Sequence, residues 1–374
     1  MLADARFLIQ PENRPVGFGE SGRSFQRTTL SSRASLYPSG SSWISGSWRR
    51  ALQGDILMRY AIGIDLGGTN IAAGLVDQQY HIVQRGSVKT NVPRSAEAIC
   101  RDMAELCASL ASQAGLSMAD ISSVGVGTAG IVWGGEIETA SNLALHHAPI
   151  ATLLSGMIGK PVYVENDANA AAYGEYIAGS HPACRSMILM TIGTGIGTGM
   201  ILDGKIYAGF NGAAAELGHT ILVPGGRLCP CGKRGCFETY CSATGLVATT
   251  REAMRFYPQS KMWDLCEGSL DKVQARTAFL AQDMEDEASS YVLDHYLDYL
   301  AIGVANTVNL LQPEVFCIGG GVSLQGDSLL MPLKKRVEAL AFAGSNGIRT
   351  RLVLASLGNN AGIIGAAMLD GMDR

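Results

Sequence analysis

The hydrophobic pattern of the chain contains one arrangement twice: an apolar run, a turn rich in glycine and threonine, and a second apolar run. In the first copy the runs are residues 60–64 and 71–76, and in the second they are residues 187–192 and 200–202. Apolar runs bounded by glycine are typical of buried strands joined in a hairpin. The pattern therefore predicts two hairpins with glycines at their tips.

The two copies also agree in length, because the interval from Asp65 to Asp77 equals that from Thr191 to Asp203. An internal duplication of this kind predicts two similar half-molecules. Glycine lets the backbone approach an anion closely, and successive free N–H groups at a turn bind phosphate oxygens. We therefore expect two phosphate-binding turns that face one cleft for a nucleoside triphosphate. Because Asp65 stands where the second copy has Thr191, only the first half offers a carboxylate to a magnesium ion.

A further apolar run, residues 161–164, precedes the polar segment 165–169 and a stretch of helix-forming residues at 170–177. Asn166 and Asp167 at this junction are both residue types that cap helices, which is one interpretation of the pair. The other is catalytic, because phosphoryl transfer to an alcohol needs a carboxylate that accepts the hydroxyl proton. A carboxylate at the carboxyl end of a strand is well placed for that role. Both interpretations are open at this point.

Two longer amphipathic helices are expected at residues 97–114 and 294–311, and the second leads through Pro313 into a strand at 315–318. This alternation of helices and strands is typical of α/β proteins. The length of 374 residues corresponds to about two domains. The pattern therefore predicts a two-domain α/β protein.

Composition excludes several classes of protein. Hydrophobic residues make up 47% of the chain and charged residues 17%, which favours a folded enzyme over a disordered scaffold. The formal net charge of -4 leaves no basic surplus for nucleic-acid phosphates or an anionic membrane surface. No run approaches the roughly 18 apolar residues of a membrane span, and the N-terminus lacks a secretory-signal pattern. We therefore expect a cytoplasmic protein with no nucleic-acid or membrane partner.

Residues 1–57 differ from the rest in composition. They hold ten serines, seven arginines and no lysine, and they show no helix or strand periodicity. Such a segment buries too little apolar surface to offset its loss of entropy on folding, so we expect it to be disordered. Its composition also suits an organellar transit peptide. Because Met58 directly precedes a strong strand pattern, we favour a start codon assigned too far upstream, or translated vector sequence.

Three of the nine cysteines, Cys229, Cys231 and Cys236, lie close together and follow His219. One imidazole and three thiolates form the tetrahedral ligand set of a structural zinc site with no open position for water. The alternative for His219 is a buried histidine that only donates and accepts hydrogen bonds. Its spacing before the cysteines favours ligation. The sequence therefore predicts structural Zn²⁺ in a reducing compartment.

Six short motifs follow one another between residues 59 and 374: 65–69 (Asp-Leu-Gly-Gly-Thr), 165–169 (Glu-Asn-Asp-Ala-Asn), 193–197 (Gly-Thr-Gly-Ile-Gly), 216–219 (Glu-Leu-Gly-His), the cysteine segment 229–238 and 319–322 (Gly-Gly-Gly-Val). In this order and spacing they resemble the ROK family of bacterial sugar kinases and repressors, with its glucokinase branch as the nearest match. The resemblance covers nearly all of residues 59–374.

The resemblance implies an α/β fold of the actin-like, hexokinase-like (ribonuclease H-like) type, in which two domains close on ATP and a hexose. The implied reaction is transfer of the γ-phosphate to the 6-hydroxyl of a hexose, with glucose favoured. N-acetylmannosamine, N-acetylglucosamine, allose and fructose remain alternatives, as does polyphosphate as the donor. The implied cofactors are Mg²⁺ with ATP and structural Zn²⁺, and the family precedent favours a homodimer.

The resemblance also implies roles for individual residues. Asp167 is the implied base that acts on the sugar hydroxyl. The residues implied to bind the sugar are Asn166, Asp167, Glu216, His219 and Glu238. Those implied to hold magnesium, the phosphates and the adenosine are Asp65, Gly67, Gly68, Thr69, Asn70, Thr194, Gly195, Gly320 and Gly321.

The implied domains are an N-terminal α/β domain at 59–178, completed by a C-terminal helix at 358–371, and a C-terminal α/β domain at 179–357 that contains the zinc segment 219–236. Two other classes of protein are compatible with parts of the chain. A sugar-responsive repressor would need residues 1–57 to form a helix-turn-helix, for which they show no helical periodicity. A zinc-ribbon interaction module would explain the cysteines but not the duplicated glycine turns.

Overall fold

The structure is a computed structural model that describes residues 59–342 and 349–372. The expected disorder of residues 1–57 concerns a segment outside this part of the chain. Within the described ranges, no helix combines the length and the apolar character needed to cross a membrane.

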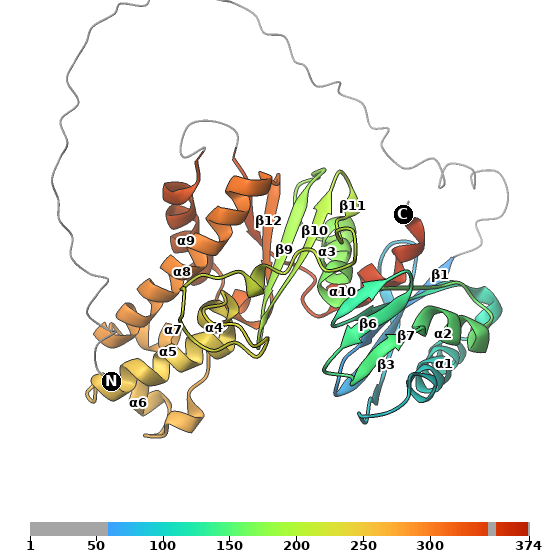
Figure 1. Ribbon diagram of the computed structural model, residues 1–374, viewed down its shortest axis with the longest axis horizontal. Helices are drawn as coiled ribbons and strands as arrows, with labels where there is room; N and C mark the ends of the chain where they lie inside the picture. The colour runs from blue at the N-terminus through green and yellow to red at the C-terminus, as the bar shows by residue number, and fades with distance from the viewer. Residues whose placement is uncertain (1–58, 343–348, 373–374) are drawn as a thin grey trace, which may run out of the picture. The chain divides into compact units, whose positions relative to one another are not determined.

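The first sheet has five strands in the order β3-β2-β1-β4-β8 (Figure 1). Strands β1, β2 and β3 pair antiparallel, whereas β1, β4 and β8 run parallel. The predicted first hairpin is confirmed, since β1 and β2 are joined by only three residues. The strand bounds are β1 Tyr60–Leu66, β2 Asn70–Val76, β3 Ile82–Lys89, β4 Ile121–Thr128 and β8 Val162–Asn166.

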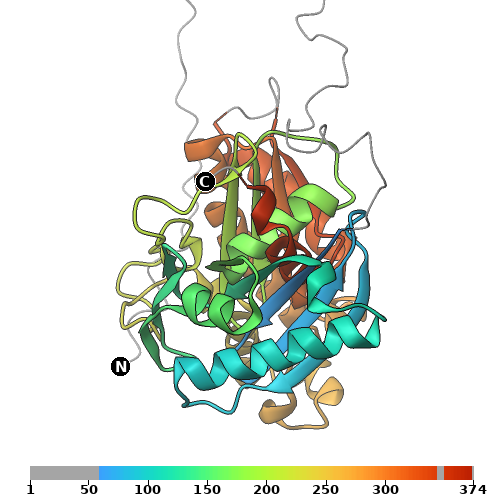
Figure 2. The same ribbon diagram turned by 90° about the vertical axis from the view of Figure 1, so that its right-hand side faces the viewer.

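Helices cover both faces of this sheet. Helices α1 (Ala96–Gln113) and α2 (Ile150–Ile158) pack on one face, where Ile62 and Ile64 of β1 point into their common core. Figure 2 shows α1, in teal, lying across the blue strands. Helix α10 (Asn360–Ala367) packs on the opposite face, where Ala61 of β1 contacts Ile363 of the helix. A helix that follows the whole second sheet in the sequence therefore completes the first sheet's core.

The second sheet also has five strands, in the order β11-β10-β9-β12-β13. Strand β9 pairs antiparallel with β10 and parallel with β12, as β1 pairs with β2 and β4. This repeated pairing is the duplication that the sequence predicted. The strand bounds are β9 Met187–Ile192, β10 Ile196–Leu202, β11 Lys205–Ile206, β12 Val315–Gly319 and β13 Arg351–Leu354.

Helices α3 and α8 lie on opposite faces of the second sheet, α3 with the side of β10 that carries Gly199 and α8 in the core formed by Ile188 and Met190. Helix α8 begins earlier than the sequence indicated, because Asp286 caps it and the hydroxyls of Ser289 and Ser290 bond to the Asp286 carbonyl. The helix bounds are α3 Asp167–Ala178, α4 Glu238–Cys241, α5 Ala243–Phe256, α6 Met262–Leu265, α7 Thr277–Gln282, α8 Glu287–Leu311 and α9 Asp327–Leu340.

A small antiparallel sheet, β5 (Ile131–Trp133), β6 (Glu136–Ala140) and β7 (Leu145–Ala148), is inserted between β4 and β8. Short 3₁₀ turns complete the described secondary structure at Met118–Asp120, Leu217–His219, Leu270–Lys272, Gly321–Gln325 and Leu369–Gly371. The C-terminal helix expected over residues 358–371 is shorter, because α10 ends at Ala367 and a 3₁₀ turn follows.

Helices α3 and α10 lie side by side between the two five-stranded sheets (Figure 1). Glycines permit this close approach. A Cβ on Gly174 would lie 2.1 Å from the Ala361 carbonyl oxygen, and one on Gly365 would lie 1.7 Å from that of Ala170. The two helix backbones are therefore almost in contact, which no larger residue at these positions allows.

Candidate active site

The first glycine turn, Gly67 to Thr69, is held by bonds that leave N–H groups free. The Gly67 N–H donates to the Asn70 carbonyl at 3.0 Å, and the Thr90 hydroxyl donates to the Gly67 carbonyl at 2.6 Å. Within the described ranges the N–H groups of Gly68 and Thr69 donate to no other residue. A Cβ on Gly68 would lie 2.6 Å from the Asn142 carbonyl oxygen, so glycine is required there. Free N–H groups at a tight turn suit a phosphate.

The second glycine turn, Gly193 to Gly195, is also closed by a hydrogen bond from the N–H group of its first glycine. The Gly193 N–H donates to the Gly195 carbonyl at 3.0 Å, and the Thr194 carbonyl accepts a bond from the hydroxyl of Thr244 at 2.8 Å. The turn is shorter than the run of glycines in the sequence indicated. Gly197 and Gly199 lie inside β10, where they allow α3 to pack: a Cβ on Gly199 would lie 2.4 Å from the Ala168 carbonyl oxygen.

Asn166 is the residue that caps α3. Its side-chain oxygen accepts hydrogen bonds from the N–H groups of Ala168 and Asn169 at 2.9 and 3.1 Å, and its side-chain nitrogen donates to the Gly130 carbonyl at 3.0 Å. Asp167 follows as the first helical residue, with one carboxylate oxygen 2.8 Å from the Ala168 N–H. The second oxygen of Asp167 accepts no bond from any described residue. Capping thus falls mainly to Asn166, and Asp167 retains a free oxygen for chemistry.

Three carboxylates gather near this helix end and influence one another. Asp65 at the end of β1 and Asp167 both have solvent-exposed side chains, yet protein surrounds each closely enough to weaken its hydration. This partial burial raises the pKa of Asp167, against the effect of the Ala168 N–H, and it raises the pKa of Asp65, with the Asp167 charge as the second cause. Burial likewise raises the pKa of Glu216, although His219 opposes it. Converging negative charges of this kind favour a divalent cation.

The predicted zinc ligands lie together, since the ligand atoms of His219, Cys229, Cys231 and Cys236 are all within 4.8 Å of one another. The sulfur atoms of Cys231 and Cys236 are 3.6 Å apart, and the Cys229 sulfur lies 3.7 Å from Nδ1 of His219. A tetrahedron with Zn–S bonds of roughly 2.3 Å has edges of roughly 3.8 Å. The four side chains therefore fit a zinc ion.

Glu238, the first residue of α4, connects this cluster to the second glycine turn. One carboxylate oxygen lies 3.0 Å from the Cys229 sulfur and 3.5 Å from Nδ1 of His219. The other accepts a bond from the Ile196 N–H at 3.4 Å, directly after the turn. Nε2 of His219 points to the other side, with a carboxylate oxygen of Glu216 at 3.9 Å. The cluster is thus continuous with the candidate site.

Gly320 and Gly321 follow β12 and adjoin the second turn. A Cβ on Gly320 would lie 2.5 Å from the Ile192 backbone, whereas one on Gly321 would meet no atom within 4 Å. A cavity of about 280 Å³ opens beside Gly321, and its other lining residues are Ala275, Arg276, Val322, Leu324 and Gln325.

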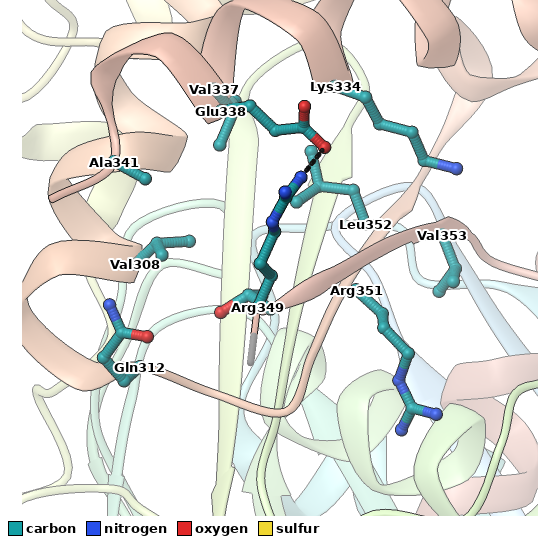
Figure 3. A pocket seen from close by; sticks show the side chains of 11 residues that line it. Val308, Gln312, Lys334, Val337, Glu338, Ala341, Arg349, Arg351, Leu352 and Val353 are labelled. Carbon is teal, nitrogen blue, oxygen red and sulfur yellow. Dashed lines mark ion pairs between the residues drawn. The ribbon is translucent and has the colours of Figure 1, made fainter. Parts of the chain in front are cut away.

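A separate pocket of about 440 Å³ contains none of the predicted site residues. It lies between α8, α9 and β13, and Figure 3 shows Val308, Val337 and Leu352 around it, with the Arg349 side chain directed toward Glu338. Their ion pair is 2.9 Å long. The candidate site is therefore recognised by its converging chemistry and not by the volume of a pocket.

Residues 61–371 match the ROK family. The chain belongs to the ROK family. A glucokinase of Halalkalibacterium halodurans is 36% identical over 318 residues, which cover 83% of this chain and 94% of that protein. An N-acetylmannosamine kinase of Salmonella typhi is 29% identical over 311 residues, covering 82% of this chain and 97% of that protein.

The ROK fold is also found in solved structures. A ROK family glucokinase from Streptomyces griseus, in complex with glucose and AMPPNP, aligns with a TM-score of 0.70 and 35% identity, over 83% of this chain and 98% of that one. The expected fold class, a duplicated two-domain α/β fold of the actin-like, hexokinase-like type, is thereby confirmed.

Two features of this ROK chain gave no signal in its sequence. The cavity beside Gly321 is lined by Arg276 and Gln325, which lie almost fifty residues apart in the sequence. Neither residue belongs to a motif. The Gly130 carbonyl that holds Asn166 belongs to a strand connection whose contact partner lies 36 residues later. Only the tertiary fold brings such residues together.

Proposed function

We propose that this protein is an ATP-dependent hexose kinase that transfers the γ-phosphate of ATP to the 6-hydroxyl of glucose. The observation that carries the proposal is the position of Asp167. Its carboxylate lies at the start of α3 with one oxygen free, beside Asp65. Glucokinase relatives at 35–36% identity, and the glucose and AMPPNP complex of the Streptomyces griseus enzyme, support the choice of acceptor and donor.

In the proposed reaction the free oxygen of Asp167 takes the proton of the 6-hydroxyl as the sugar oxygen forms its bond to the γ-phosphorus. The bond between that phosphorus and the β,γ-bridging oxygen breaks, and its electrons leave with ADP. Partial burial raises the pKa of the Asp167 carboxyl, which brings it closer to the optimum for a general base. Positioning of the sugar by neighbouring side chains supplies the rest of the rate acceleration.

The phosphates are assigned to the two glycine turns. The free N–H groups of Gly68 and Thr69 face one side of the donor, and Thr194 and Gly195 face the other. When bound with ATP, Mg²⁺ neutralises charge that develops on the phosphates, and Asp65 is the residue proposed to orient it, with Asn70 nearby. Gly320 and Gly321 are proposed to lie near the adenosine, and the adjoining cavity of about 280 Å³ supports this assignment.

The sugar hydroxyls are assigned to Glu216, His219 and Glu238, with a smaller part for Asn166. Capping and the bond to Gly130 already use the Asn166 oxygen and one of its N–H groups, so a single N–H remains for a ligand. Zn²⁺ held by His219 and the three cysteines is proposed to be structural. It fixes the imidazole so that Nε2 faces the sugar side of the site.

An ADP-release assay over glucose, mannose, allose, fructose, N-acetylglucosamine and N-acetylmannosamine tests the proposal. We expect the highest kcat/KM with glucose. A tenfold or greater preference for an acetamido sugar overturns the choice of glucose while leaving the kinase intact. The N-acetylmannosamine kinase relative makes that sugar the second candidate. Activity with none of the six sugars overturns the kinase proposal.

The remaining sequence predictions also stay proposals. We propose domains at 59–178 with the C-terminal helix, and at 179–357, a division that follows the membership of the two five-stranded sheets. A cytoplasmic location, a homodimer and the lack of a nucleic-acid partner are expected on the sequence arguments given above.

A further inference from the structure

Two connections join the halves of the described fold. The chain leaves the first sheet through α3 and enters the second at β9, and it returns between β13 and α10. Residues Gly179 to Ser186 form the end of the first connection, and residues 355–359 form the second. In kinases that close around their substrates, a few residues in such connections act as the hinge.

Glu175, in the last turn of α3, links these two connections. Its oxygen Oε1 accepts hydrogen bonds from the Ser356 N–H at 2.6 Å and from the Ser356 hydroxyl at 2.7 Å, and Oε2 accepts from the Leu357 N–H at 3.1 Å. The Ser356 hydroxyl oxygen in turn accepts from the Ser180 N–H at 2.8 Å. One carboxylate and one hydroxyl thus link the first connection directly to the second.

The chemistry of this link requires a carboxylate. Glu175 is only 1% exposed, and no lysine or arginine of the described ranges forms an ion pair with it. Burial of an unpaired charge is costly unless hydrogen bonds compensate it. All three partners are donors, so the position needs a group that only accepts. Glutamine has one accepting oxygen, and its NH₂ group would face a donor.

The link also lies between the two halves of the candidate site. Helix α3 begins at Asp167, two turns before Glu175, and its side facing β10 packs on the strand that follows the second glycine turn. The second connection leads directly into α10, which packs against β1, the strand that carries Asp65. A shift of Ser356 relative to Glu175 would therefore move Asp167 relative to Asp65.

We propose that Glu175 is a positioning residue that fastens both connections into one hinge, about which the two halves close on sugar and nucleotide. The proposal rests on the function proposed above. Gly179 belongs to the same device, because a Cβ there would lie 2.5 Å from the Oε1 atom of Glu175. Because one closure serves both substrates, loss of the link impairs the use of glucose and of ATP together.

The chain contains a matched control for a merely structural role. Asp286 is also a buried carboxylate, 6% exposed, that accepts from the Ser260 hydroxyl at 3.0 Å and from the N–H groups of Lys261 and Ser289, each at 2.7 Å. It caps α8 and touches neither connection. Asp286→Asn removes a similar charge from a similar set of donors, so it reports the cost of disturbing a buried carboxylate alone.

The experiment compares Glu175→Gln, Ser356→Ala and Asp286→Asn in the full chain. For each variant, kcat/KM is measured for glucose and for ATP, and small-angle X-ray scattering measures the decrease in radius of gyration that glucose induces. We expect Glu175→Gln to lower both kcat/KM values by the same factor, about tenfold, which is below the roughly 10²-fold cost of a 1 Å misplacement. Ser356→Ala should lower both kcat/KM values by a smaller common factor. In both variants, the decrease in radius of gyration that glucose induces should differ from that of the wild type.

Several outcomes overturn the hinge. One is that Glu175→Gln and Asp286→Asn have equal effects, and another is that only one substrate is affected, which would place Glu175 in a subsite. If Glu175→Gln does not fold, the Ser356→Ala variant decides. Wild-type kcat/KM values and a wild-type scattering response in that variant overturn the proposal. If the wild type phosphorylates no sugar, the proposed function fails, and the scattering response to Mg·ATP in the wild type and Ser356→Ala then tests the hinge separately.

Discussion

Each of the two glycine turns is closed by a hydrogen bond from the N–H group of its first glycine, but the turns differ in the next-to-last residue of the preceding strand. At this position β1 carries Asp65, and β9 carries Thr191. The Thr191 hydroxyl donates to the Gly197 carbonyl of the paired strand at 3.3 Å, so its polar group is satisfied within the sheet. The Asp65 carboxylate accepts no hydrogen bond from the part of the chain that the structure describes, and it faces Asp167.

This difference shows how a duplicated fold acquires a one-sided chemistry. Both turns present N–H groups that suit phosphate, because glycine and strand geometry are common to them. At the equivalent strand positions only the first half carries a carboxylate, Asp65. The second turn is instead connected through Glu238 to the histidine and cysteine cluster. The polar surroundings of the two turns therefore differ, with a carboxylate beside the first and the histidine and cysteine cluster beside the second.

The largest expected effect concerns the charge that the first half contributes through Asp167. Asp167→Asn keeps the size of the side chain and removes the accepting oxygen that takes the proton. General-base catalysis contributes about 10²–10⁴-fold, so we expect kcat to fall by that factor with little change in the KM for ATP. Steady-state kinetics at saturating glucose measures it. A variant that keeps more than a tenth of the wild-type kcat would show that Asp167 is not the base.

The second prediction compares substitutions at the equivalent positions before the two turns. Asp65→Asn should lower kcat/KM for Mg·ATP by about 100-fold, because a carboxylate that orients the cation is lost. Thr191→Val, at the equivalent position, removes only an internal hydrogen bond and should leave activity within about threefold of the wild type. A titration with Mg²⁺ at fixed ATP measures both variants. Equal losses in the two would contradict the functional asymmetry of the turns.

The third prediction concerns the histidine and cysteine cluster of the second half. Cys231→Ser removes one of four zinc ligands, and we expect the variant to lose bound zinc and to show an increase of about tenfold in the KM for glucose, because His219 is then poorly oriented. Metal analysis and steady-state kinetics measure the two effects. Less than half a zinc per chain in purified, active wild-type protein would contradict the assignment of the site.

The smallest expected effect is on stability. Because burial raises the pKa of Asp65 in the folded protein above its value of roughly 3.9 in the unfolded chain, the folded state binds the proton more tightly. The contribution of protonated Asp65 to the stability of the folded state is present below about pH 4. It is lost as the pH rises through the pKa of Asp65 in the folded protein. Asp65→Asn should therefore raise the Tm by about 2 °C near pH 7 and have no such advantage near pH 4. Thermal unfolding across this range measures it, and a lower Tm at pH 7 would contradict it.

Local patterns in the sequence were enough to predict much of the fold. The hairpin at Gly67 and Gly68, the strand before Asn166 and the four predicted zinc ligands all depend on residues close together in the sequence, and the structure brings each group together. The assignment of Asp167 was left between a cap and a base. Hydrogen bonds settle the capping, because Asn166 holds the two N–H groups that a cap must satisfy.

Long-range packing accounts for what the sequence did not reveal. Gly197 and Gly199 belong by pattern to a turn, but α3 packs on them, so they lie within β10. The early start of α8 depends on Asp286, whose carboxylate is fixed by Ser260, 26 residues away. The role proposed for Glu175 depends on Ser356, 181 residues later. No local pattern records contacts of this range.

The docking of α10 has a consequence for the order in which the protein is made. The strands of the first sheet are translated early, but Gly63 and Gly125 leave one of its faces open for a helix: a Cβ on Gly125 would lie 1.7 Å from the Ala366 carbonyl oxygen. Helix α10 is translated only after all the strands of the second sheet. Part of the apolar face of the first half therefore stays uncovered in the nascent chain until the second half has been synthesised.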